Sequence, residues 1–271
     1  MELIDFLQYG FAQRALVAGT FIALLCSTLG IFLVLRRFSL IGDGLAHATF
    51  GSVALAMLLN MTPLYASIPI VMACSLGILK LTEKARLYGD AAIGVVSSMG
   101  IATGIILSSI AGCFNVDLFS YLFGSILSIS TTEVIISTVL SLMVILVIIL
   151  YYHELMSITF DAESAKVSGI NTKLINNIFV LLTAMTVVLS MKVAGILLIS
   201  ALFIFPPITA LQIAQSFNMM IICSGLSAII SVISGIIVSF FLDLPTGATI
   251  VVMNFILFIT VITSKKLITR R

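Results

Sequence analysis

Long apolar segments recur from one end of the chain to the other, and they restrict its possible folds more than any other feature. A helix that crosses about 30 Å of hydrocarbon needs about 20 residues. Nine segments of the sequence approach or exceed that length. We therefore expect an all-α integral membrane protein with about nine transmembrane helices. The expected spans are residues 12–35, 40–59, 63–81, 91–113, 132–152, 174–190, 193–211, 219–242 and 246–263.

The composition agrees with a membrane environment. Of the 271 residues, 61% are hydrophobic and 9% are charged, and the mean hydropathy is +1.30. A soluble domain carries about 25% charged residues, so most of the surface of this chain must face lipid. The formal net charge of +2 is too small to indicate nucleic-acid binding. We treat residues 1–271 as a single transmembrane domain whose first span directs insertion, because the acidic N-terminus does not resemble a removable signal peptide.

Basic residues lie in short clusters beside the spans, and such clusters mark cytoplasmic loops. The clusters that follow the first, third, fifth and ninth spans fall on one side if the N-terminus is outside. We therefore expect an external N-terminus and a cytoplasmic C-terminus, with Lys192 as an exception on the outer side. The apolar segment 118–129 is short for a span, which favours a re-entrant or interfacial helix. The cytoplasmic clusters are Arg36 and Arg37; Lys80, Lys84 and Arg86; Lys166 and Lys173; and Lys265, Lys266, Arg270 and Arg271.

Two polar side chains interrupt the second span. Asp43 and His47 are four residues apart, so they share one face of a helix. An aspartate at the centre of a membrane helix is unfavourable by about 2.5 to 3.5 kcal/mol on translocon scales, so it needs a partner or a function. Carboxylate oxygen and imidazole nitrogen together suit zinc and are acceptable to manganese. A second copy of the chain would complete four ligands if the second span lies near a dimer axis; the alternative is that the two side chains only hydrogen-bond each other or neighbouring helices.

A polar segment, residues 155–173, follows the fifth span on the expected cytoplasmic side. Asp161 is a good N-cap, the next six residues favour helix, and Gly169 is well placed to end it. About two turns of isolated helix are marginal in water, so this element needs to pack against something. It is either a docking helix for a cytoplasmic partner or an ordinary solvated loop. His153, just before this segment, is expected at the membrane interface.

Glycine and proline suggest two further features. Gly100 and Gly104 have the GxxxG spacing that lets two helix backbones approach. Gly195 and the pair Pro206 and Pro207 interrupt the seventh span, where the prolines should bend or break the helix. This interruption is either a hinge or pathway lining, or a tolerated kink.

Three separated motifs together resemble the membrane permeases of the zinc and manganese ATP-binding cassette (ABC) importers. They are SLIGDGLAHATFG at 39–51, ITFDAESAKVSGI at 158–170 and VAGILLISALFIFPPITA at 193–210. The likeness extends over nearly the whole chain in length and span order. It implies the type II ABC importer permease architecture in a bacterial cell membrane. It also implies a homodimeric permease with two cytoplasmic ABC ATPase subunits and an extracellular metal-binding protein as partners.

The resemblance also assigns roles to residues. Asp43 and His47 match the family's metal-coordinating pair in the translocation path, and part of the polar segment matches its coupling helix, which docks into the ATPase. The chain has no GxxxxGK[ST] phosphate loop, so another chain must hydrolyse ATP. We expect a transport subunit, not an enzyme, with no permanently bound cofactor. The residues that match the coupling helix are Phe160, Asp161, Ala162, Glu163, Ala165, Lys166 and Gly169.

The expected transported ion is zinc, because the sequence motif GDGLAHATF is closer to that of the zinc members of the family. Manganese is the alternative. A secondary metal carrier would normally need more ionisable residues in its spans than this one pair. A membrane aspartyl protease would need two facing carboxylates, and no other expected span contains an aspartate or glutamate well inside it. The sequence therefore favours a metal ABC permease over both of these classes.

Overall fold

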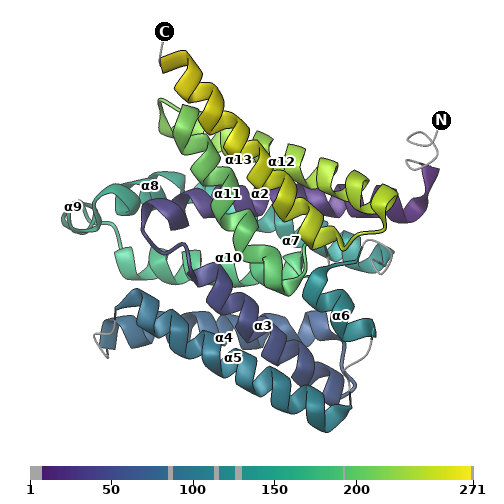
Figure 1. The fold of residues 1–271 in the computed structure, drawn as a ribbon. Helices are drawn as coiled ribbons and strands as arrows, with labels where there is room; N and C mark the ends of the chain where they lie inside the picture. The colour runs from purple at the N-terminus through teal and green to yellow at the C-terminus, as the bar shows by residue number, and fades with distance from the viewer. Residues whose placement is uncertain (1–7, 85–87, 113–115, 126–129, 192, 270–271) are drawn as a thin grey trace.

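The computed structural model describes residues 8–84, 88–112, 116–125, 130–191 and 193–269, and every regular element in these ranges is a helix (Figure 1). This confirms the expected all-α class. Of the expected topology charges, Arg86, Lys192, Arg270 and Arg271 lie outside the described residues. The elements are α2 (Gly10–Leu35), α3 (Ile41–Leu58), α4 (Pro63–Lys84), α5 (Gly89–Ala111), α6 (Val116–Phe123), α7 (Thr131–Leu150), α8 (Tyr152–Phe160), α9 (Ala162–Val167), α10 (Thr172–Ser190), the 3-10 helix η1 (Ile196–Leu198), α11 (Ile199–Ile213), α12 (Phe217–Leu242) and α13 (Thr246–Thr269).

Eight helices in the described part of the chain are long and apolar enough to cross a membrane. They correspond to eight of the nine expected spans. The remaining one, the seventh expected span at residues 193–211, is instead a broken element. Its helix α11 has only 15 residues and follows η1 and a non-helical stretch. The eight helices are α2, α3, α4, α5, α7, α10, α12 and α13.

The break in the seventh expected span occurs at Gly195 and not at the two prolines. Gly195 has a φ of +79°, a left-handed backbone conformation that glycine adopts without steric cost. Pro206 and Pro207 both lie inside α11, which stays helical through Ile213. Since Pro207 has no N–H to donate, the carbonyl of Phe203 has no α-helical partner. Gly30 of α2 packs directly on that carbonyl, where a Cβ would lie 2.3 Å from the oxygen.

The helices form two groups with α10 between them (Figure 1). One group contains α3, α4 and α5, and the other contains α2, α11, α12 and α13; α10 contacts α4 and α3 on one side and α2 on the other. Of the candidate spans, α3 is the most enclosed, with 72% of its 18 residues buried, whereas only 22% of the α7 window is buried. Thus α3 is an interior helix and α7 is peripheral.

The GxxxG pair explains how closely α5 approaches α3. A Cβ added to Gly100 would lie 2.5 Å from the backbone oxygen of His47, and one added to Gly104 would lie 2.4 Å from the Phe50 ring. Gly51 of α3 faces Gly100 in the same way, since a Cβ added to Gly51 would lie 2.9 Å from the carbonyl oxygen of Gly100. The expected close packing at Gly100 and Gly104 is therefore confirmed, and it holds the backbone of His47 in place.

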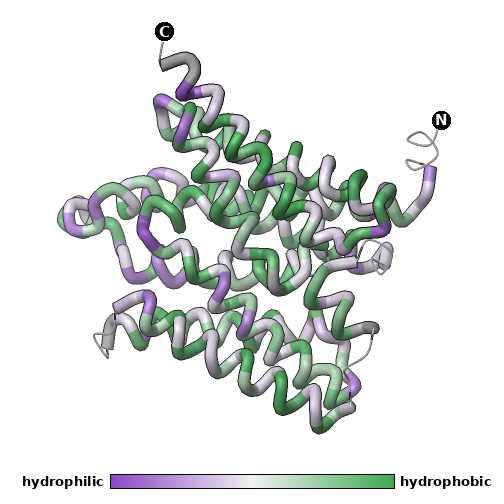
Figure 2. The backbone as a smooth tube through the Cα atoms, viewed as in Figure 1, coloured by the Kyte–Doolittle hydropathy of each residue, from purple (hydrophilic) through white to green (hydrophobic). Residues whose placement is uncertain are grey.

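The two ends of the bundle differ in polarity. Hydrophilic residues gather in the turn between α2 and α3, around α9 and at the start of α10, whereas the long helices are mostly hydrophobic (Figure 2). The short helix α6 lies at the opposite end from α8 and α9 (Figure 1). With eight residues, α6 is too short to span the bilayer, as expected for this segment; residues 126–129 of that expectation lie outside the described part.

Candidate functional site

The structure places Asp43 in the first turn of α3 and His47 one turn further along. The sequence analysis assigned Asp43 the cost of a helix centre, so this is a correction. The N-terminus of a helix carries a partial positive charge that stabilises a carboxylate by about 0.3 to 1 kcal/mol at exposed positions. The cost of an aspartate at a helix centre therefore does not apply in full to Asp43.

The two side chains lie close together without satisfying each other. Nε2 of His47 is 3.6 Å from Oδ2 of Asp43, which is longer than a hydrogen bond. Among the described residues, no other side chain or backbone group forms a hydrogen bond with either of them. Lone pairs on the carboxylate and the imidazole therefore remain available to an incoming ligand.

Exposure distinguishes this pair from the rest of α3. The Asp43 side chain is 44% exposed and that of His47 is 20% exposed, while Gly44, Leu45 and Ala46 between them are buried. The pair thus forms a narrow accessible stripe on the most enclosed span. A polar stripe at membrane depth must face a water-filled cavity or another protein surface.

The glycines on either side of Asp43, in the sequence GDG, allow α3 to approach its neighbours closely. A Cβ on Gly44 would lie 2.6 Å from the Ile93 side chain of α5, and one on Gly42 would lie 3.0 Å from the Phe203 ring of α11. The glycines therefore let α3 pack tightly against α5 and α11. This packing fixes the direction in which the Asp43 stripe faces.

The number of potential ligands grouped in the described residues limits the kind of metal site that one chain can form. Within the described ranges, no three His, Cys, Asp or Glu side chains are grouped so that they could hold one. A structural zinc site uses four protein ligands and a catalytic one three. Asp43 and His47 from a single chain therefore suit a partly open, transient site.

The polar segment after α7 folds as expected. The Asp161 carboxylate accepts hydrogen bonds from the backbone N–H groups of Glu163 and Ser164, each at 3.0 Å. This cap begins α9, and Gly169, with a φ of +87°, follows its end. The N-cap, the helix and its terminating glycine are confirmed.

Most of the residues assigned to the coupling helix face outward. Ala165 is buried and anchors α9 to the bundle, while Asp161, Ala162, Glu163, Lys166 and Gly169 are exposed. Two apolar side chains are also exposed, Phe160 by 64% and Val167 by 90%. Apolar side chains this exposed at the polar end of the bundle favour a docking surface over an ordinary loop.

Sequence reasoning missed one residue near this surface. Arg36 was treated only as a topology charge, yet its guanidinium donates three hydrogen bonds, to residues of α8 and α10. Its partners lie 119 to 140 positions further along the chain. Only its position immediately after an apolar span was visible in the sequence, and many membrane proteins have basic residues there.

An all-helical bundle of membrane-spanning helices, with an accessible polar pair on an interior helix and an exposed helix at one end, defines a polytopic membrane transport component. Residues 8–265 match the family model described as the ABC 3 transport family. The chain therefore belongs to this family, whose members are membrane subunits of ABC transporters, and the resemblance recognised in the sequence is confirmed.

Relatives and a solved structure support this membership over the whole chain. The manganese transport system membrane protein MntC of Listeria monocytogenes is 31% identical over 252 residues, covering 93% of this chain and 90% of the relative. The high-affinity zinc uptake system membrane protein ZnuB of Haemophilus influenzae is 31% identical over 245 residues, covering 90% and 94%. PsaBC from Streptococcus pneumoniae, solved in complex with Fab, has a TM-score of 0.84 and 28% identity, covering 96% and 94%.

These comparisons confirm a multi-pass metal ABC permease with the fold of PsaBC. The relatives are named for both manganese and zinc transport. The choice between the two metals therefore belongs to the proposal below.

Proposed function

We propose that this chain is the permease subunit of an ABC importer that carries a divalent metal ion, zinc in the first instance, into a bacterial cell. The observation that carries the proposal is the accessible stripe of Asp43 and His47 on the most enclosed span. ATP is hydrolysed by separate cytoplasmic subunits, and an extracellular metal-binding protein delivers the ion. The N-terminus lies outside and the C-terminus in the cytoplasm.

The proposed metal site forms between two copies of the chain. Each copy supplies the carboxylate of Asp43 and the imidazole of His47, so a dimer with α3 near its axis provides four ligands. Two nitrogen and two oxygen ligands match the coordination number of zinc. Manganese is the second candidate, because it accepts carboxylate oxygen readily and because the MntC relative is named for it.

The transported ion must leave as readily as it enters. A site split between two chains suits this need, because a small displacement of one α3 relative to the other removes ligands in pairs. A closed site within one chain would hold the ion more tightly. The absence of a third grouped ligand in the described residues supports the split arrangement.

The proposed contact with the ATPase is α9 and the residues around it. Phe160 offers an exposed aromatic side chain, Asp161 and Gly169 define the ends of the helix, and Ala165 anchors it to the bundle. The exposed residues Ala162, Glu163 and Lys166 complete the docking surface. Hydrolysis in the ATPase moves this surface and drives the transport cycle.

Metal binding by the purified permease–ATPase complex tests the proposal without transport. We expect one radioactive zinc ion for every two chains, lost in His47→Ala and retained in the matched control His153→Ala. His153 is the only other histidine of the chain and is exposed at the start of α8. Equal zinc binding by wild type and His47→Ala would rule out the pair as the metal site.

A further inference from the structure

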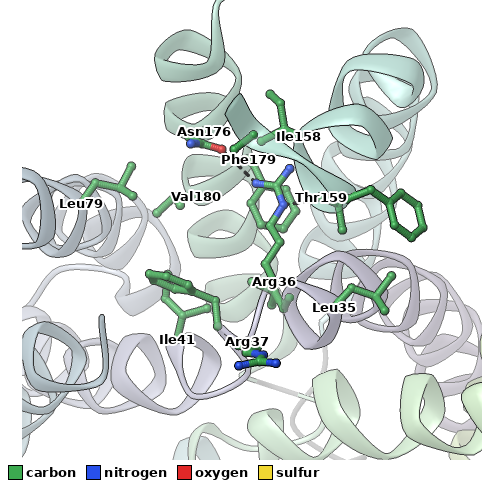
Figure 3. Close-up of a pocket in the computed structure, with 14 residues that line it drawn as sticks. Leu35, Arg36, Arg37, Ile41, Leu79, Ile158, Thr159, Asn176, Phe179 and Val180 are labelled. Atoms are coloured by element: carbon green, nitrogen blue, oxygen red, sulfur yellow. Dashed lines mark hydrogen bonds between the residues drawn. The ribbon is translucent and has the colours of Figure 1, made fainter. Parts of the chain in front are cut away.

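Arg36 lies in the turn between α2 and α3 and is held by neutral groups. Its Nε donates to Thr159 Oγ1 at 2.9 Å, Nη1 donates to Asn176 Oδ1 at 2.9 Å, and Nη2 donates to the Leu155 carbonyl at 3.1 Å. Its Cζ lies 4.7 Å from the centre of the Phe179 ring. Figure 3 shows the guanidinium reaching toward Asn176 and over that ring.

The contacts of Arg36 join the proposed docking end to the proposed metal-site helix. Arg36 is the C-cap of α2, and α3 begins five residues later, with Asp43 in its first turn. Thr159 lies two residues before Asp161, the N-cap of α9. Asn176 belongs to α10, which packs against α3. One side chain therefore links the start of α3, the end of α8 and α10.

Arginine is suited to this link and lysine is not. The planar guanidinium holds several acceptors at once in a fixed geometry, whereas an ammonium is a single compact charge on a flexible chain. Burial lowers the pKa of Arg36 to about 10, which keeps the group charged at neutral pH. Among the described residues Arg36 has no acidic partner, and a partly buried cation is costly unless it is hydrogen-bonded, so its three hydrogen bonds offset part of this cost.

The space around Arg36 leaves room for movement. A cavity of about 400 Å³ lies beside it, lined by side chains of α3, α4, α8 and α10 that include Ile41, Leu79, Ile158 and Val180. This volume lies between α8 and the start of α3, to which Ile158 and Ile41 belong. The hydrogen bonds of Arg36 connect the turn between α2 and α3 to α8 and α10 beside this cavity (Figure 3).

We propose that Arg36 is a positioning residue that transmits displacement of α8 and α9 to α3, and so to Asp43 and His47. This inference rests on the function proposed above. When the docking end moves, the bonds to Leu155 and Thr159 pull the turn that begins α3. Without the guanidinium, ATP hydrolysis continues but is no longer tightly linked to metal movement.

The test uses the complete transporter, with its ATPase and metal-binding protein, reconstituted in vesicles. For each variant, three quantities are measured: the amount of ATPase that co-purifies, the rate of ATP hydrolysis, and the number of metal ions transported per ATP. For Arg36→Gln we expect normal assembly and hydrolysis within about twofold, but a fall of about tenfold in metal ions per ATP, since hydrogen bonds from a charged group are the stronger ones. Arg36→Lys restores part of the loss.

Arg37→Gln is the matched control, because it removes the same charge one residue away. Arg37 is exposed and points away from Arg36 (Figure 3), so we expect the wild-type ratio of metal to ATP. Thr159→Val keeps the arginine and removes one acceptor, so we expect a drop of about two- to fivefold. If Arg36→Gln fails to assemble, the ratio of metal to ATP in Thr159→Val tests the inference instead.

Two results would overturn the inference. One is an unchanged ratio of metal to ATP in both Arg36→Gln and Thr159→Val. The other is an equal loss in Arg37→Gln, which would indicate a general charge effect. Failure of the proposed function looks different, because the wild-type transporter itself would then move no metal when ATP is supplied.

Discussion

At the scale of single residues, the positions of Asp43 and His47 depend on glycines at the contact between α3 and α5. A side chain at Gly100 of α5 would overlap the backbone of His47, and one at Gly44 of α3 would overlap the side chain of Ile93. Neither glycine is needed for a positive φ, since both lie within regular helix. Their role is to bring α3 and α5 into contact.

Gly100→Ala should therefore displace the metal-site helix. The new methyl group would overlap the His47 backbone, and overpacking of this kind costs about 1 to 3 kcal/mol. We expect a lower unfolding temperature of the purified protein in detergent and weaker zinc binding. Gly94→Ala is the matched control on the same helix, because nothing lies within 4 Å of a Cβ at Gly94. Equal behaviour of the two variants would contradict this role for Gly100.

The contacts of single residues are only partly predictable from the sequence. The choice of Asp43 and His47 as candidates rested on two polar residues in an apolar span, which is a local pattern. Arg36 had an equally plain local explanation as a topology charge, and its actual partners, Thr159 and Asn176, are 123 and 140 positions away. Such long-range contacts depend on how the helices pack, which a single sequence does not specify.

At the scale of elements, α9 depends on one capping side chain. Asp161 accepts from two backbone N–H groups that would otherwise lack partners at the start of the helix. The helix has only six residues, so it has few internal hydrogen bonds to compensate for the loss of its cap.

Asp161→Ala should therefore weaken docking of the ATPase. Loss of an N-cap costs about 0.5 to 2 kcal/mol, which is large for so short a helix. We expect less ATPase to co-purify with the variant. Asp161→Asn separates capping from charge, because asparagine caps as well as aspartate. If Asp161→Asn loses as much ATPase as Asp161→Ala, the carboxylate acts directly on the partner and not through the cap.

The elements were mostly predictable because their signals are local. Span length and apolarity predicted nine spans, of which eight are helices long enough to cross a membrane, and Asp161 and Gly169 predicted the ends of α9. The break at Gly195 was predicted less accurately, because residues 193–198 are as apolar as a regular span. Pro206 and Pro207 suggested a break that α11 does not have, because a helix tolerates prolines where packing accommodates the freed carbonyls, as Gly30 does for Phe203.

At the scale of the whole molecule, the arrangement separates two proposed tasks. The interior helix α3 holds the accessible pair, and α9 with the proposed docking surface lies at one end of the bundle (Figure 1). The helices α5 and α7 are peripheral, since only 22% of the residues in the most apolar part of each are buried, and they expose apolar side chains. In the function proposed above, the ATPase contacts one end of the bundle and a second copy of the chain completes the metal site.

Uptake by reconstituted vesicles tests the central claim most directly. Vesicles that contain this chain with its ATPase and metal-binding protein are supplied with ATP, and uptake of radioactive zinc and manganese is measured in parallel for wild type, His47→Ala and His153→Ala. We expect ATP-dependent zinc uptake in wild type and His153→Ala, and loss of it in His47→Ala. Loss of manganese uptake alone would reverse the choice of metal. Uptake of either ion that is unaffected by His47→Ala, or that persists without ATP, would contradict the account.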